Sequence, residues 1–491
     1  MNFKLIALVS TFVFLSACAG QTGHSVPDAD RIAASEATLR IAVQAYGGVV
    51  TGAEATESLV TQIGSDIAAG TGVDLPWEFI VTNSTTPRAW SLPGGKVVLS
   101  RGLITQLAGE AELGAVLAHL IAHSVAQDMP DVEPAPVPVP DIRSPNREPN
   151  FLPPEAGAAL LSTHLPHSQA AEQAAGRLTA TLLERAGYPA TGWSALLSRL
   201  ATSDADLSAL ASRHVWDPTA GATSNAEPGD VSAWKQRIAE LRASEPVYEL
   251  IDRARDALGN DDLAAAIEAA DEAIGLRPGE AAALGMRGEI ALAQEDYETA
   301  REYFDRAISA DADNYRYYLG RGIAGAELGD LKPPRDDLED SEARLPTALT
   351  HLYLGDLYRK GLYPEPAKAH YEAAMYTNGE IFQRAADAYK RLDIVDRPQN
   401  YLMARPVITE ERKVRAIVAN PSDIPVRSVQ FEFNAIVNGE PQSKIVMVGR
   451  LPPSSRGHIA SGWTLGEDDD PTSVTVRPIA LKLSRRGTSE Q

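Results

Sequence analysis

Residues 89–123 read AWSLPGGKVVLSRGLITQLAGEAELGAVLAHLIAH, and this stretch decides the fold of the first part of the chain. A strand pattern at 96–100 follows a Pro-Gly-Gly turn, and a helical pattern then runs from Glu110 to His123. His119 and His123 are four residues apart, which puts both imidazoles on one face of that helix. The spacing therefore predicts a pair of side chains that can share a metal ion.

The residue after the first histidine departs from a known metal-binding pattern. In H-E-x-x-H, the glutamate takes a proton from the metal-bound water. This chain reads HLIAH, so Leu120 stands in that position, where it also extends the apolar stripe of positions 113, 116 and 117. Loss of a general base typically costs about 10²–10⁴-fold in rate. The sequence thus predicts a histidine pair without the group that activates water.

The flanking segments predict a mostly helical domain with a small sheet. Residues 33–46 and 54–69 have helical patterns, and residues 77–82 read as a strand. We expect this domain to span residues 51–242, after an N-terminal tether and helix at 18–50. The chain as a whole is expected to be a multidomain α+β protein.

The quoted stretch resembles the core of the M48 peptidases, whose members read approximately NAFALPGGYIFVTRGLL…EAELAAVLAHEIGH. The resemblance covers about residues 55–240 and includes LLERAGYPATGWSALLSRL at 182–200. It implies a gluzincin fold, in which two histidines and a distant glutamate hold zinc.

The resemblance assigns a role to each site position. It implies that His119 and His123 are metal ligands and that Leu120 occupies the place of the base. Counting back from Ala-Gly-Tyr at 186–188 puts the third ligand at Ala174, and an accompanying aspartate becomes Gly176. The implied zinc is then weakly held or absent, and the domain is a pseudopeptidase.

The resemblance also implies a cleft beside the substrate-binding edge strand. Arg88 takes the place of a family asparagine there, and His214 is a retained late histidine. The remaining cleft positions are Ala89, Trp90, Leu92, Pro93, Gly94 and Gly95.

Other side chains offer alternatives for the missing groups. Glu172 lies two residues before the expected ligand, so it would point to a different helical face without a register shift. His164 and His167 follow a proline-rich insertion at 130–154, and we expect them to be solvated loop residues. Asp128 is expected at the surface or as a cap. The insertion itself reads as a linker, a cover or a docking strap.

Residues 245–395 form a repeat array. Gly288, Gly322 and Gly355 recur at intervals of 34 and 33 residues. This spacing of small residues resembles tetratricopeptide repeats, whose paired helices approach closely and whose usual role is to bind proteins or peptides. Pro333-Pro334 and Ser341 depart from the pattern, so we expect the third unit to be distorted.

The remaining C-terminal part changes to period-two alternation. Strand patterns at 414–418 and 429–433 precede Asn438-Gly439, a tight hairpin signal. We expect an immunoglobulin-like β domain at 401–484 and a disordered tail at 485–491.

The first residues predict export. A basic start and an apolar run at 5–15 end in Leu-Ser-Ala-Cys, which resembles the lipobox of bacterial lipoproteins. We expect a signal peptide at 1–17, lipidation of Cys18, and anchoring on the periplasmic face of the outer membrane, as Ala19 suggests. The alternative is an ordinary secretory signal with a chance cysteine.

The acidic composition restricts the partners. The formal net charge of −21 argues against nucleic acid. Three functions stay open: an impaired peptidase homologue that binds envelope proteins in quality control or assembly, an active zinc endopeptidase with an unorthodox base or ligand, and a repeat scaffold with the peptidase region as spacer.

Overall fold

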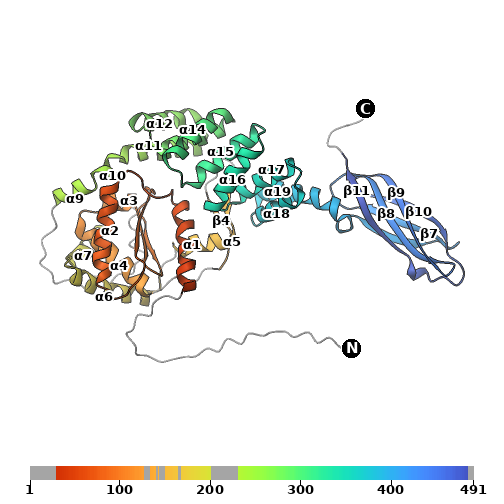
Figure 1. The fold of residues 1–491 in the computed structure, drawn as a ribbon, viewed down its shortest axis with the longest axis horizontal. Coiled ribbons are helices and arrows are strands. Elements are labelled where there is room, and N and C mark those ends of the chain that lie inside the picture. Colours follow the sequence, from red (N-terminus) through yellow and green to blue (C-terminus); the bar gives the residue numbers. More distant parts are fainter. Residues whose placement is uncertain are drawn as a thin grey trace, which may run out of the picture.

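The computed structural model describes residues 29–126, 133–139, 142, 150–163, 167–200 and 231–484. Three regions follow one another along the molecule: a mixed helical and sheet region, a helical array and a β domain (Figure 1). The predicted signal peptide with Cys18, the tail at 485–491 and about half of the proline-rich insertion lie outside the described residues. Asp128, His164 and His214 lie outside them as well.

The first region consists of a three-stranded sheet, a two-stranded ribbon and the helices packed around them. The strands β1 (Glu78–Thr82), β2 (Ala89–Leu92) and β3 (Lys96–Ser100) lie in the order β1-β3-β2, with β1 parallel and β2 antiparallel to β3. Its helices are α1 (Ala29–Ala45), α2 (Glu54–Ala69), α3 (Arg101–Gln106), α4 (Glu110–Ala126), α5 (Pro154–Ser162), α6 (Gln169–Ala186), α7 (Thr191–Leu200), α9 (Val231–Arg237) and α10 (Ala239–Ala243). A two-stranded ribbon pairs β4 (Val137–Val139) with β5 (Asn150–Leu152).

The helix α4 lies at the centre of this region because it is buried on nearly all sides from Glu112 to Val125. A helix that is apolar all round belongs in the interior of a domain. Helices α2, α6 and α7 and strand β2 pack around α4. The predicted α+β arrangement is thereby confirmed, and the histidine helix is its core element.

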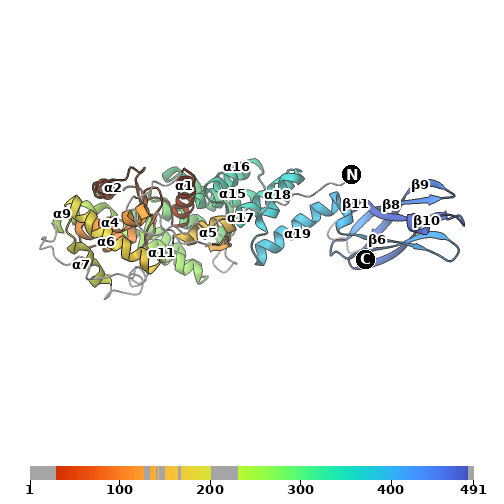
Figure 2. The same ribbon diagram turned by 90° about the horizontal axis from the view of Figure 1, so that it is seen from below.

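Four helix pairs and a closing helix make up the array. The pairs are α11 (Glu245–Gly259) with α12 (Leu263–Leu276), α13 (Ala281–Ala293) with α14 (Tyr297–Ala310), α15 (Tyr315–Glu327) with α16 (Lys332–Arg344), and α17 (Ala348–Lys360) with α18 (Pro364–Ala374). The closing helix is α19 (Gly379–Asp396). Figure 2 shows the array extending away from the first region toward the β domain.

The repeated glycines are sites of close helix contact. A Cβ added at Gly288 would lie 2.9 Å from Phe304, and one at Gly355 would lie 2.6 Å from Tyr371. Each clash is with the second helix of the same pair, 16 residues further along the chain. The periodicity in the sequence therefore reports the closest approach within each pair.

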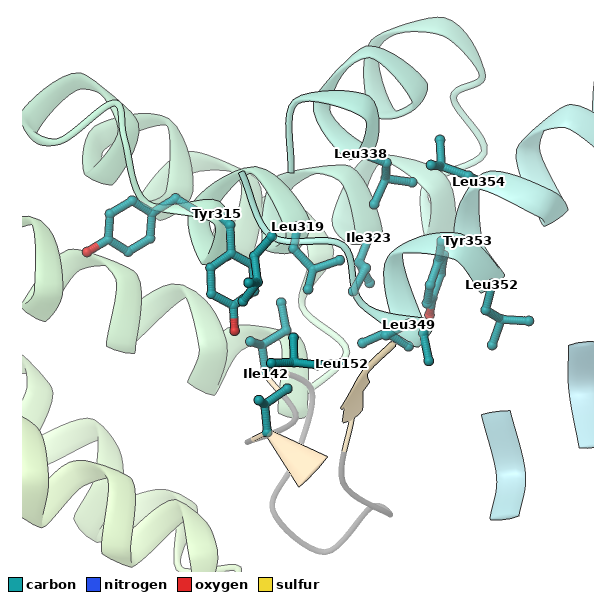
Figure 3. Packing of buried hydrophobic residues seen from close by; sticks show 14 of the residues in the cluster. Ile142, Leu152, Tyr315, Leu319, Ile323, Leu338, Leu349, Leu352, Tyr353 and Leu354 are labelled. Carbon is teal, nitrogen blue, oxygen red and sulfur yellow. The ribbon is translucent and has the colours of Figure 1, made fainter. Parts of the chain in front are cut away.

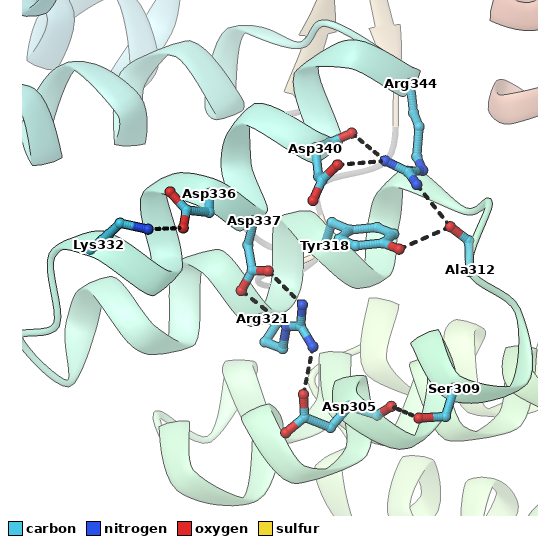
Figure 4. Close-up of polar contacts among 10 residues, drawn as sticks. All are labelled: Asp305, Ser309, Ala312, Tyr318, Arg321, Lys332, Asp336, Asp337, Asp340 and Arg344. Atoms are coloured by element: carbon cyan, nitrogen blue, oxygen red, sulfur yellow. Dashed lines mark hydrogen bonds and ion pairs between the residues drawn. The ribbon is translucent and has the colours of Figure 1, made fainter.

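The third pair is regular, so the expected distortion was wrong. Pro333 and Pro334 fall in the first turn of α16, where a missing N–H and a fixed φ are compatible with a helix. Ser341 is fully buried at a small-residue position. Arg321 then joins this pair to the previous one, since its guanidinium donates to Asp305 at 2.6 Å and to Asp337 at 3.0 Å (Figure 4).

The array packs against the first region through an apolar cluster. The side chains of Leu152 and Ile142 lie beneath Tyr315, Leu319 and Leu349 (Figure 3). Two hydrogen bonds fix the ribbon there: the Leu349 N–H donates to Asn150 Oδ1 at 2.9 Å, and the Tyr376 hydroxyl donates to the Phe151 carbonyl at 2.9 Å. The face that α15 and α17 present on this side is thus covered by the chain's own β5.

A buried guanidinium makes a second junction. Arg101 donates to the Leu241 carbonyl at 3.2 Å and to Asn83 Oδ1 at 3.1 Å, and its guanidinium lies 3.5 Å from the centre of the Tyr248 ring on α11. Burial lowers the pKa of Arg101, while the nearby Tyr248 and Glu280 oppose that shift. The Arg101 side chain therefore links the first region to the first repeat.

The β domain has two three-stranded sheets. One has the order β10-β7-β6 and the other β11-β8-β9. The strands are β6 (Met403–Ile408), β7 (Lys413–Asn420), β8 (Val426–Val437), β9 (Glu440–Leu451), β10 (Ser455–Thr464) and β11 (Thr475–Leu483), with short 3₁₀ turns η1 (Pro398–Asn400) and η2 (Pro471–Ser473). Asn438 and Gly439 both have positive φ in the β8–β9 turn, which confirms the predicted hairpin.

In the described part of the chain, no helix has the length and apolar character that a membrane crossing requires.

The glycine contacts make a stability prediction. Gly355→Ala should lower the free energy of unfolding of the array by about 1–3 kcal/mol, because Tyr371 must shift to make room. The matched control is Gly275→Ala in α12, where an added Cβ meets nothing within 4 Å. Alanine favours helix there, so that variant should be neutral or up to about 1 kcal/mol more stable. Urea unfolding followed by circular dichroism measures both, and equal effects would contradict the prediction.

Candidate metal centre

Three buried side chains converge between α4 and α6. The Nε2 atoms of His119 and His123 lie 3.0 Å apart. Glu172 places Oε2 3.4 Å from the His119 Nε2 and Oε1 3.4 Å from the His123 Nε2. Each of the three residues is only 2% exposed. Two imidazole nitrogens and a carboxylate therefore face one point inside the protein.

This arrangement corrects the prediction for the third ligand. Ala174 is exposed on α6, whereas Glu172 faces the histidines. Glu172, Ala175 and Thr179 are the buried positions of the first half of α6, and their spacing of three and four residues defines one helical face. Counting back from residues 186–188 assumed a fixed spacing, but in this chain the carboxylate lies two residues earlier.

The spacing of the three groups fits a metal ion. A tetrahedral ion about 2.0–2.2 Å from each of three ligands holds them roughly 3.3–3.5 Å apart. The observed separations are 3.0 Å between the two Nε2 atoms and 3.4 Å from each Nε2 to a different oxygen of Glu172. Two histidines and a glutamate are also a donor set that zinc uses in catalytic sites, with a fourth position left over. The residues present therefore fit a zinc ion.

A hydroxyl beside His119 orients its ring. Thr179 donates its hydroxyl proton to the Ala175 carbonyl at 2.8 Å, so its oxygen can only accept from the His119 Nδ1, 3.4 Å away. That contact puts the ring proton on Nδ1 and leaves the Nε2 lone pair directed toward His123 and Glu172. A partner behind a ligating histidine commonly fixes its tautomer in this way.

Two further rings cover the centre. The Trp193 ring stacks on His119 with centroids 5.2 Å apart, and the His167 ring stacks on His123 at 3.9 Å and 13°. His167 is half-buried, so the expectation of a solvated loop residue was wrong. Neither contact was foreseen from the sequence, because both partners are distant from α4 along the chain.

The base position is apolar in the structure. Leu120 is 3% exposed and belongs to the apolar cluster of the first region, together with Leu117 and Ile121. Within the described residues, no further histidine, cysteine or acidic side chain groups with His119, His123 and Glu172. Among the residues that the structure describes, the centre thus has ligands for a metal but no second carboxylate.

The predicted cleft residues form the wall beside the histidine helix. Gly94 and Gly95 have φ of +84° and +86°, so the Pro-Gly-Gly turn depends on glycine. Ser124, the residue after His123, donates to the Leu92 carbonyl at 2.7 Å and accepts from the Gly95 N–H at 3.0 Å. This turn is therefore fixed to α4, with Trp90 and Leu92 buried behind it.

The remaining two predicted cleft residues are Arg88 and His214. The Arg88 guanidinium lies over the Tyr46 ring at 5.1 Å. His214 lies outside the described residues.

Comparison with known proteins agrees with the two regions. Residues 54–131 match the profile of peptidase family M48, and residues 251–315 and 286–332 match the tetratricopeptide repeat. A 65-residue stretch is 43% identical to the mitochondrial metalloendopeptidase OMA1 of Schizosaccharomyces pombe. That match covers 13% of this chain and 19% of the relative's length.

Solved repeat proteins are similar over the array. The TPR domain of Arabidopsis OM64 is 20% identical over 24% of this chain and 98% of its own, with a TM-score of 0.23. A thermophilic TPR protein of Thermus thermophilus is 19% identical over 32% of this chain and 89% of its own, with a TM-score of 0.27. The profile matches show that the chain carries an M48-like peptidase segment and tetratricopeptide repeats.

The geometry predicts that Glu172 is needed for metal binding. Glu172→Gln should weaken zinc binding by at least about 10-fold, since an anionic ligand is replaced by a neutral amide. Glu184→Gln is the matched control, because Glu184 is exposed on the same helix. Competition with a chromogenic chelator measures both affinities. Equal zinc affinity in the two variants would show that Glu172 is not a ligand.

Proposed function

We propose that the first region holds a zinc ion through His119, His123 and Glu172 and serves in protein binding, with hydrolysis impaired. The observation that carries this proposal is the complete ligand set beside a buried leucine at the base position. When bound, zinc would polarise a carbonyl and lower the pKa of a bound water. Leu120 cannot accept the proton of that water or deliver one to a leaving amine.

Neighbouring residues cover the three proposed zinc ligands. All three ligands are almost fully buried, with His167 over one imidazole and Trp193 over the other. A peptide carbonyl must reach the fourth coordination position before it can be cleaved. In this arrangement the covering rings exclude water and substrate until they move. Thr179 meanwhile orients His119 as a ligand.

The repeats supply the partner-binding part of the proposal. Tetratricopeptide arrays usually bind proteins or peptides, and the partners proposed here are proteins of the cell envelope, in quality control or assembly. The face of α15 and α17 against the first region is already covered by β5. Partners would therefore use other surfaces of the array, or displace the ribbon.

A specific observation favours a second function, an active zinc endopeptidase. Glu172 completes a three-ligand set that the sequence seemed to lack, so the metal half of a peptidase site is present. Activity would then need a base from a residue that approaches when the cover opens. The pure scaffold reading is less favoured, because deleting the peptidase region would expose the array's apolar contact with Leu152 and Trp90.

Restoring the base tests the proposal. Leu120→Glu should raise zinc-dependent cleavage of β-casein by about 10²-fold or more over the natural protein, because the general base returns. Leu120→Gln is the matched control, with similar size and no basic group, and it should give no increase.

Two outcomes separate the candidate functions. Cleavage by the natural protein that Glu172→Gln abolishes would favour the active peptidase. If the zinc-loaded Leu120→Glu variant and the natural protein are both inactive, the missing base is not the reason for inactivity and the first proposal loses its main support.

The proposed location rests on the lipobox-like LSAC sequence. We propose that Cys18 carries lipid and anchors the protein on the periplasmic face of the outer membrane. Cys18→Ser should move the protein from the membrane pellet to the soluble periplasmic fraction, measured by fractionation and immunoblotting. A chance cysteine would leave the distribution unchanged.

A further inference from the structure

A second group of metal-type ligands lies in the repeat array, far along the chain from His119. Glu342 on α16, His351 on α17 and His370 on α18 bring one potential ligand atom each within 4.8 Å of one another. The His351 Nδ1 lies 3.3 Å from Glu342 Oε1 and 3.3 Å from the His370 Nδ1. Three different helices thus contribute to one point.

Hydrogen bonds among Glu342, His351 and His370 cannot satisfy all three side chains at once. A neutral imidazole nitrogen either carries one proton or accepts one. If the His351 Nδ1 donates to Glu342, it cannot also donate to His370. If it accepts from His370, its lone pair faces the Glu342 carboxylate. A cation among the three atoms would satisfy all of them at once.

The distances suit such a cation. The two measured separations of 3.3 Å match the roughly 3.3–3.5 Å expected between ligands of a tetrahedral ion at about 2.0–2.2 Å. Glu342 keeps 32% of its side chain exposed, which leaves an approach from solvent.

Neighbouring groups hold His370 in place. The Tyr358 ring stacks on the His370 ring with centroids 5.3 Å apart and planes 11° apart. The Tyr358 hydroxyl in turn donates to Glu339 at 2.7 Å. These contacts restrict the orientation of the His370 ring.

We propose that Glu342, His351 and His370 form a second site for a divalent transition-metal ion, with zinc as the best match to two imidazoles and a carboxylate. The ion joins α16 of the third helix pair to both helices of the fourth pair. It therefore acts as a cross-link within the array, independent of the centre at His119. Water fills the remaining coordination position.

Metal stoichiometry of the full-length protein tests this site. After stripping with a chelator, the natural protein should bind two equivalents of Zn²⁺ in isothermal titration, and Glu172→Gln should bind one with high affinity. His370→Gln should also lose one equivalent, and the double variant should lose both. His458→Gln is the matched control, since His458 is exposed in the β domain, and it should keep two.

Thermal unfolding gives a second readout that does not depend on peptidase chemistry. In the Glu172→Gln background, zinc at about 100 times its Kd should raise the Tm of the array by roughly 5–10 °C. Adding His370→Gln should remove that rise, while circular dichroism without metal should show the same helix content. If Glu172→Gln binds no zinc, or if His370→Gln changes neither stoichiometry nor the zinc-dependent Tm, the second site does not exist.

Discussion

A buried carboxylate between two imidazoles is the constraint on which the first region depends. Glu172 is 2% exposed and contacts His119 and His123 at 3.4 Å. Removing a carboxylate from water costs several kcal/mol unless a positive charge and hydrogen bonds compensate it. A metal ion, or a proton on one of the imidazoles, would supply such a positive charge. The packing of α4 against α6 places the carboxylate and both imidazoles in the interior of the first region.

In the proposed function, the same burial would slow catalysis. A catalytic centre needs a ligand position that substrate can reach, but here the rings of His167 and Trp193 lie on the two imidazoles. Leu120 adds to this, because its side chain belongs to the apolar cluster of the domain. Under the function proposed above, His119, His123 and Glu172 would hold the metal, and Leu120 would leave it without the usual base.

The sequence predicted the local features of the molecule well. Period and spacing located the histidine helix, and the recurring glycines marked the contacts within the repeats. The Asn438-Gly439 turn was also predicted, because its chemistry requires positive φ. Each of these features depends on residues that are close in the chain or related by a fixed period. One error was local, because the prolines at 333–334 fall in the first turn of α16 and do not distort the third helix pair. The other errors concerned groups that meet only in three dimensions. Glu172 was set aside because the count from residues 186–188 assumed a family spacing, although positions 172, 175 and 179 share the buried face of α6. His167 reaches His123 across a segment whose path the sequence does not specify. Periodicity locates helices, but it does not say which buried polar groups will face one another.

The contact between the array and the first region makes the two parts one structural unit. Apolar side chains of α15 and α17 share a single cluster with Leu152, Trp90 and Leu39 of the first region. The guanidinium of Arg101 adds a second contact: it donates to the Leu241 carbonyl and lies over the Tyr248 ring of α11. Separating the parts would expose the apolar surface and remove the Tyr248 ring from that guanidinium. A partner that displaces the β5 ribbon would therefore open the apolar contact between the two parts.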